Sequence, residues 1–288
     1  MIISSISTDY KYHEVLTTKA HVEKSMSDTV FRQLLEQLRG NRGDAAHWTV
    51  ILQSLFEHHL QQERKIDRVY EGQSILIDRR EHGESAVSPE NKLVYGLFRN
   101  LWKDETGPQL ITIGQDVYFP LSCQVPNQGS HRGRRIDLLA MTQAGSLAVF
   151  EFKVAENQSD TVLAAVLEAL DYLACLLGAG NMQRISDEFG KLKHYRLGPD
   201  HSFCSVHPNE AAVPEVIVVA PKLYYEAASR SPRGTSGEWL RNSTAANESD
   251  VVRIRFAVTE VENDRFTQKM TWVTENSWPG LAVGRWPV

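Results

Sequence analysis

Three charged side chains lie within two apolar segments that a short polar linker separates. Asp137 belongs to the run over residues 134–141, while Glu151 and Lys153 belong to the run over residues 147–154. Both runs are rich in Ile, Leu, Val and Phe, as expected of strands that are buried on both faces. Burying a charge is costly unless it is paired or binds a metal, so these three residues are candidates for chemistry.

The spacing predicts that the three side chains meet on one face of a hairpin. Gly145 can adopt the positive φ that a short hairpin loop needs. A loop over residues 143–145 would place Asp137 opposite Glu151. Lys153 would point to the same side as Glu151, because side chains alternate between the faces of a strand.

Two carboxylates and an ammonium on one face allow two interpretations. Two close carboxylates repel each other, and a divalent cation removes that conflict. Mg²⁺ is bound by one or two carboxylates, keeps several waters and contacts substrate phosphates. A lysine beside it can orient a water or stabilise charge that develops on a phosphate. The other interpretation is a buried salt bridge of Lys153 with Asp137 or Glu151.

These residues resemble the core of the PD-(D/E)XK nuclease superfamily. The string RRIDLLAM followed by GSLAVFEFKV is similar to the form found in its mismatch-endonuclease and defence-associated branches. The resemblance implies catalytic roles for Asp137, Glu151 and Lys153. It also implies that Asp137, Glu151 and the Phe152 carbonyl hold Mg²⁺ or Mn²⁺.

A helix is predicted to begin at Ser88 and Pro89, since serine is a good N-cap and proline is tolerated in the first turn. In the superfamily, a helix that precedes the core strands often supplies an acidic residue to the metal site. The resemblance makes Glu90 the candidate for that catalytic position. Alternatively, Glu90 only complements the positive end of the helix dipole.

Basic residues precede Asp137. A polar loop is predicted over residues 124–130, and Arg132, Arg134 and Arg135 follow it. Arginines beside an acidic metal site suggest contacts to the phosphates of a nucleic acid. The alternative is an ordinary charged stretch at the start of a strand.

A second helix is predicted over residues 159–177, and Glu168 and Tyr172 lie one turn apart on it. In several branches of the superfamily, a helix at this place carries a Gln followed by a Tyr at this spacing. Here Glu168 takes the Gln position, which departs from that pattern. Glu168 is either a further carboxylate of the metal site or a solvated helix residue.

Composition sets limits on location and partners. The chain has 288 residues and a formal net charge of −5, so DNA binding would need a local basic patch. The three cysteines have no metal-ligand spacing and indicate reduced thiols in a cytoplasmic protein. No segment is long and apolar enough to span a bilayer, so no membrane association is expected.

The order of predicted elements gives the domain organisation. Residues 1–70 are predicted to form a helical N-terminal extension, and residues 71–288 a PD-(D/E)XK nuclease-like domain with an insertion at about 178–213. The fold expected from this order and from the resemblance is α/β and restriction-endonuclease-like. It has a mixed central sheet flanked by helices. The extension has apolar faces and is predicted to contact a second copy or a partner protein.

Together these features predict a metal-dependent nuclease that hydrolyses phosphodiester bonds. The residues themselves indicate a phosphate ester and a metal, while the resemblance implies a DNA endonuclease in bacterial defence or repair. The alternative is a catalytically silent nuclease-fold subunit that binds nucleic acid or serves in assembly, because a fold does not determine a function.

Overall fold

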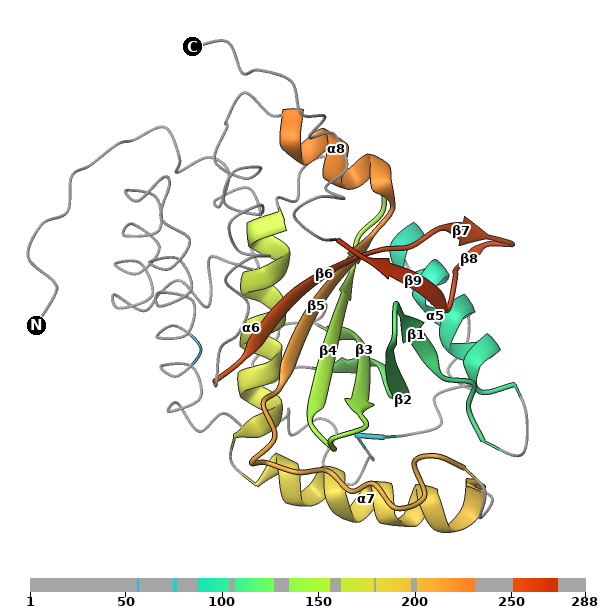
Figure 1. Ribbon diagram of the computed structural model, residues 1–288, viewed down its shortest axis with the longest axis vertical. Coiled ribbons are helices and arrows are strands. Elements are labelled where there is room, and N and C mark those ends of the chain that lie inside the picture. The colour runs from blue at the N-terminus through green and yellow to red at the C-terminus, as the bar shows by residue number, and fades with distance from the viewer. Residues whose placement is uncertain are drawn as a thin grey trace, which may run out of the picture.

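Figure 1 shows the chain as a computed structural model, which describes residues 56, 75–76, 88–103, 107–126, 135–155, 162–178, 180–197, 201–230 and 251–273. In chain order these residues form α5 (Pro89–Leu101), β1 (Ile111–Ile113), β2 (Asp116–Pro126), β3 (Arg135–Thr142), β4 (Leu147–Phe152), α6 (Val162–Leu177), α7 (Asn181–Arg196), β5 (Glu215–Ala220), α8 (Lys222–Arg230), β6 (Arg253–Val258), β7 (Val261–Glu262), β8 (Arg265–Phe266) and β9 (Lys269–Trp272). Of the residues with predicted chemistry, those that the structure describes lie on α5, β3, β4 and α6, or directly after β4.

The predicted hairpin is confirmed as β3 and β4. Gly145 has a φ of 84°, and a Cβ atom there would lie 2.2 Å from the carbonyl oxygen of His207. Both observations require glycine at this turn. The two strands pair antiparallel with Leu138 opposite Phe150, so the next position outward brings the backbone of Asp137 beside that of β4.

Helix α5 begins where the sequence predicts it. The Ser88 hydroxyl accepts a hydrogen bond from the Asn91 N–H at 3.1 Å, which caps one of the free N–H groups of the first turn. The apolar stripe of the helix is buried and consists of Val94, Leu97, Phe98 and Leu101. Packing of this stripe fixes the orientation of the helix and therefore the direction of Glu90 in its first turn.

The strands close into a barrel in the order β1-β2-β3-β4-β5-β6-β9. Neighbouring strands from β1 to β4 pair antiparallel, while β4, β5 and β6 pair parallel. Strand β9 then pairs antiparallel with β6 and parallel with β1, so both sheet edges acquire a partner. The predicted restriction-endonuclease-like α/β fold, with a mixed central sheet flanked by helices, is therefore wrong, because the mixed sheet closes into a barrel. The physical reason is that β9 satisfies the unpaired N–H and C=O groups of both edge strands.

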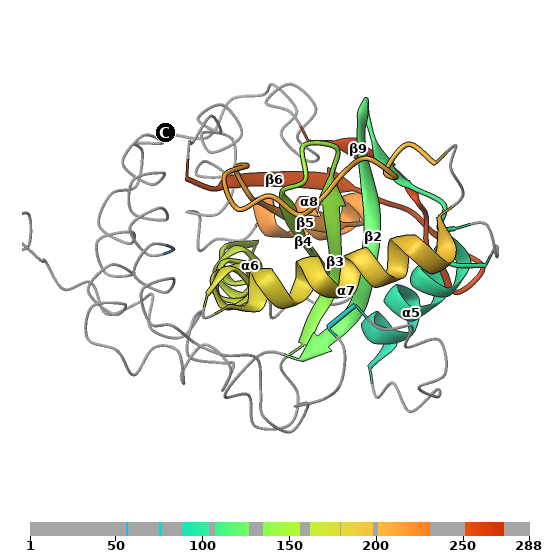
Figure 2. The same ribbon diagram turned by 90° about the horizontal axis from the view of Figure 1, so that it is seen from below.

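Helices pack against different parts of this barrel. Helix α6 lies along β4 and β5, and its Val166, Leu170 and Leu173 are buried. Helix α5 contacts β2 and β8. Helix α7 contacts α6 and runs across one end of the strands (Figure 2). The end of β4 therefore lies between the first turn of α5 and the middle of α6.

Several predictions fall on other parts of the chain. The predicted extension over residues 1–70 lies outside the described residues, apart from the buried Phe56. The predicted insertion at 178–213 contains α7. No helix in the described part of the chain combines the length and the hydrophobicity that crossing a membrane requires.

Candidate functional site

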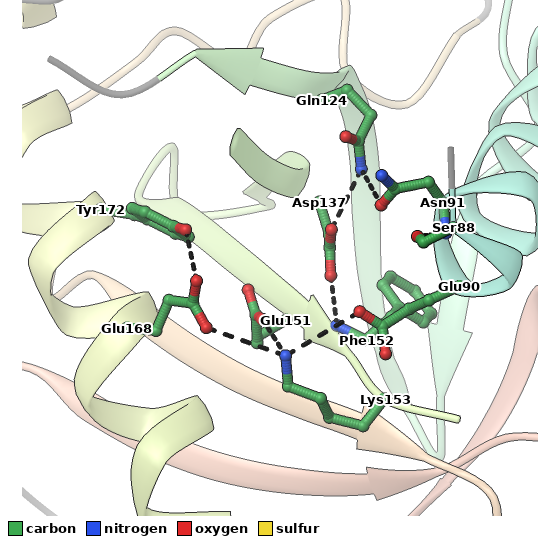
Figure 3. Close-up of polar contacts among 10 residues, drawn as sticks. All are labelled: Ser88, Glu90, Asn91, Gln124, Asp137, Glu151, Phe152, Lys153, Glu168 and Tyr172. Carbon is green, nitrogen blue, oxygen red and sulfur yellow. Dashed lines mark hydrogen bonds and ion pairs between the residues drawn. The ribbon is translucent and has the colours of Figure 1, made fainter. Parts of the chain in front are cut away.

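The predicted charged residues converge at the end of β4, and Lys153 is their common partner. The Lys153 Nζ atom lies 2.5 Å from Glu151 Oε1 and 4.0 Å from Oε1 of Glu90 in α5. Oε2 of Glu168 in α6 lies 3.8 Å from the same nitrogen. Figure 3 shows that the three carboxylates approach this ammonium from three elements. Glu168 therefore belongs to the cluster, with 23% of its side chain still exposed.

Asp137 is held on both of its carboxylate oxygens. Oδ2 accepts a hydrogen bond from the Phe152 N–H at 2.9 Å, and Oδ1 accepts one from the Gln124 side-chain amide at 3.0 Å. The same amide nitrogen donates to Asn91 Oδ1 at 3.2 Å. Hydrogen bonds to the ionised carboxylate favour its charged form.

Sequence reasoning missed Gln124 and Asn91. The polar loop predicted over residues 124–130 is wrong at its start, because β2 continues to Pro126. Neither residue belongs to a spacing pattern that indicates the site, because the contact between Gln124 and Asn91 depends on how β2 and α5 pack.

Burial sets the electrostatics of the two core carboxylates. Asp137 and Glu151 are 6% and 3% exposed. Burial, followed by the charge of Glu90, raises the pKa of Asp137 to about 7. Burial also raises the pKa of Glu151 well above its usual range, against the opposing effect of the Lys153 charge. Desolvation disfavours the charged form of an acid, so a bound cation would favour the ionised forms of both groups.

Lys153 stays protonated in this environment. Burial alone lowers the pKa of its ammonium, but the negative charges of Glu151, Glu168 and Glu90 outweigh that effect and raise the pKa well above its usual range. An ammonium that keeps its proton donates hydrogen bonds and cannot act as a base. Lys153 can therefore act as a hydrogen-bond donor and as a positive charge.

Tyr172 orients Glu168 towards the cluster. The Tyr172 hydroxyl donates a hydrogen bond to Glu168 Oε1 at 2.6 Å, which leaves Oε2 to approach Lys153. Burial and the charge of Glu168 raise the pKa of Tyr172 well above its usual range, so the phenol remains a donor. The one-turn spacing of the two residues thus produces a hydrogen-bonded pair on one face of α6.

The donor chemistry of the cluster suits a hard divalent cation. Three carboxylates face the Lys153 ammonium, and Glu151 Oε2 and Glu90 Oε2 are buried without a hydrogen-bond partner. Carboxylate oxygens are the ligands that Mg²⁺ prefers. Within the described ranges, no group of three or more His, Cys, Asp or Glu side chains already has an arrangement that could hold a metal ion. The three glutamates are instead directed at Lys153.

The predicted phosphate-binding arginines lie at the edge of the described chain. Arg132 and Arg134 lie outside the described residues. Arg135 is the first residue of β3 and is exposed, two positions before Asp137. Its place is compatible with a contact to a ligand that approaches Asp137 from solvent.

We expect the metal-free protein to be more stable at about pH 5 than at about pH 8. The pKa of Asp137 is raised in the folded state, so folding favours the protonated form. The resulting stability is fully present below the ordinary pKa of 3.8 and is lost as the pH rises through about 7. The raised pKa of Glu151 acts in the same direction. Urea unfolding across this pH range measures how the free energy of unfolding changes with pH.

The control for this prediction is Asp137→Asn, which removes one titrating group and should flatten the pH dependence. Added Mg²⁺ should stabilise the wild-type protein most at the alkaline end, where it competes least with protons. A free energy of unfolding that rises steadily from acid to alkaline pH would contradict the prediction.

Comparison with known proteins identifies no relative: no family model, no curated protein and no solved structure matches this chain. The resemblance to the PD-(D/E)XK superfamily therefore stays a prediction that rests on the motif residues. The function has to be argued from the side-chain cluster.

Proposed function

We propose that this chain is a metal-dependent nuclease that hydrolyses phosphodiester bonds. The observation that carries the proposal lies in the described part of the chain: three glutamates surround the Lys153 ammonium, and one oxygen each of Glu151 and Glu90 is buried without a hydrogen bond. Uncompensated buried acids cost stability unless a cation neutralises them. The motif residues and their resemblance to the superfamily add to this support.

Asp137, Glu151 and the Phe152 carbonyl are the groups that would hold Mg²⁺ or Mn²⁺, with Glu90 as a third acid. When bound, such an ion polarises a phosphate oxygen and lowers the pKa of a coordinated water. The protein's own part is to fix Asp137 through its two hydrogen-bond donors and to keep the acids close together.

Lys153 is proposed to position the attacking water and to stabilise charge on the phosphate. Its raised pKa keeps it a donor throughout, so it supplies hydrogen bonds and positive charge rather than proton abstraction. Glu168, held by Tyr172, keeps the ammonium directed into the cluster.

We propose DNA as the substrate, on the resemblance alone. The same resemblance suggests a cytoplasmic endonuclease in bacterial defence or repair. Arg132, Arg134 and Arg135 are proposed to contact the phosphates of the nucleic acid, since they immediately precede Asp137 in the sequence.

The test is to incubate the purified chain with plasmid and linear DNA, with Mg²⁺, with Mn²⁺ and with a chelator. Single-stranded RNA of matched length distinguishes the two nucleic acids. We expect cleavage that requires the metal and is lost in Asp137→Ala and Lys153→Ala. The matched control is Lys222→Ala, because Lys222 is exposed and pairs only loosely with Glu226 at 3.6 Å. Cleavage that survives both site variants would overturn the assignment.

One observation favours a second candidate, a non-cleaving subunit that binds nucleic acid or a partner protein. The three glutamates are already arranged around the Lys153 ammonium, as in a structural ion-pair network. Calorimetry with Mn²⁺ separates the candidates. Tight binding of DNA or a partner without any metal binding would favour the subunit.

A further inference from the structure

Gln124 adopts a backbone conformation that is unusual for its residue type. Its φ is 52°, in the left-handed region that residues with a Cβ atom rarely occupy. The residue lies in β2 between two regular pairs with β3, Cys123 opposite Leu138 and Val125 opposite Ile136. The residue is only 2% exposed. Strain of this kind persists where the surrounding structure requires it, and it is concentrated at functional sites.

The conformation directs the Gln124 amide into the candidate site. An amide NH₂ group has two hydrogens. The Gln124 NH₂ nitrogen donates to Asp137 Oδ1 at 3.0 Å and to Asn91 Oδ1 at 3.2 Å, as Figure 3 shows. One side chain therefore joins strand β3 to helix α5 at the level of the acids.

The two acceptors, Asp137 and Asn91, lie on strand β3 and helix α5, which carry the acids Asp137 and Glu90. Asn91 follows Glu90 directly, and its own N–H is bound by the cap residue Ser88 at 3.1 Å. Fixing the Asn91 side chain therefore fixes the first turn of α5 and with it Glu90. Fixing Asp137 Oδ1 leaves that carboxylate little freedom, because the Phe152 N–H holds its other oxygen.

We propose that Gln124 is a positioning residue that aligns Asp137 and Glu90 for cation binding. This inference rests on the proposed function. Hydrogen-bond partners of metal-binding carboxylates fix their orientation, and replacing such partners lowers metal affinity or activity by about 10- to 100-fold.

The test variant is Gln124→Met, which keeps the length of the side chain and the strain at its Cβ atom but removes the amide. We expect the Mn²⁺ affinity, measured by calorimetry with the ion alone, to fall by about tenfold. We expect kcat for DNA cleavage to fall while KM for DNA is unchanged, because the amide NH₂ group already donates to Asp137 and Asn91. The spectrum of bound Mn²⁺ in electron paramagnetic resonance should also change. The matched control is Gln183→Met, which removes an exposed amide–carboxylate hydrogen bond of 2.8 Å to Asp187.

A second variant, Gln124→Gly, covers the case in which the first fails to fold, since glycine adopts this φ without strain. A folded variant with weakened Mn²⁺ binding supports the positioning role. Wild-type Mn²⁺ affinity and kcat in a folded Gln124 variant overturn it, while the proposed function stands. A wild-type protein that neither binds Mn²⁺ nor cleaves DNA overturns the proposed function, and the positioning role with it.

Discussion

Asp137→Asn is expected to abolish detectable Mn²⁺ binding and to lower DNA cleavage by roughly a thousandfold, the upper scale for losing one electrostatic contact in an active site. The change removes a negative charge but keeps the shape of the side chain. It also replaces one carboxylate oxygen by an NH₂ group. One of the two donors, the Gln124 amide or the Phe152 N–H, then loses its acceptor on this side chain. Calorimetry with Mn²⁺ and a plasmid-nicking assay measure the two effects.

The control for this prediction is Glu262→Gln, which neutralises an exposed acid on the short strand β7. It should leave binding and cleavage at wild-type levels. Circular dichroism confirms that each variant is folded before its activity is compared. A folded Asp137→Asn protein that binds Mn²⁺ and nicks DNA as the wild type does would remove Asp137 from the proposed metal site.

Lys153→Met is expected to destabilise the metal-free protein by about 3–5 kcal/mol at about pH 8, the usual cost of removing one partner of a buried ion pair. Lys153 is 3% exposed and is the cation that faces Glu151, Glu90 and Glu168. Without it, these acids lose their compensating charge. The loss should be smaller at about pH 5, where the acids with raised pKa values take up protons.

Urea unfolding at both pH values measures this effect, and Lys222→Met is the matched control. The Lys222 side chain is 67% exposed, and pairs of that kind contribute at most about 1 kcal/mol. Added Mg²⁺ should restore part of the lost stability if the acids bind the ion, because a ligand that binds only the folded state stabilises it. A loss as small as that of the control would show that the acids do not depend on Lys153.

The local part of the site could be predicted from the sequence. A hairpin loop with glycine at Gly145 and the alternation of side chains along a strand set which residues share a face, and both are local properties. They predicted that Asp137, Glu151 and Lys153 would lie together. The cap at Ser88 also marked the start of α5, because capping involves only residues three or four positions apart.

The remaining parts depended on contacts between distant segments. Gln124 reaches the site through a left-handed backbone position that no composition pattern indicates. Glu168 joins it because α6 packs along β4 and β5, which brings one helix face towards Lys153. In both cases the packing of elements decides the contact.

The closure of the sheet also depends on contacts between distant segments. Strand β9 pairs antiparallel with β6, which lies nearby in the sequence. The sequence did not predict that β9 also pairs with β1, at Thr112 with Lys269 and Ile113 with Met270. Hydrophobic periodicity specifies which face of a strand is buried but not which distant strand completes an edge. The sequence by itself therefore determined the hairpin that carries the acids, while tertiary packing decided the barrel and the residues that surround them.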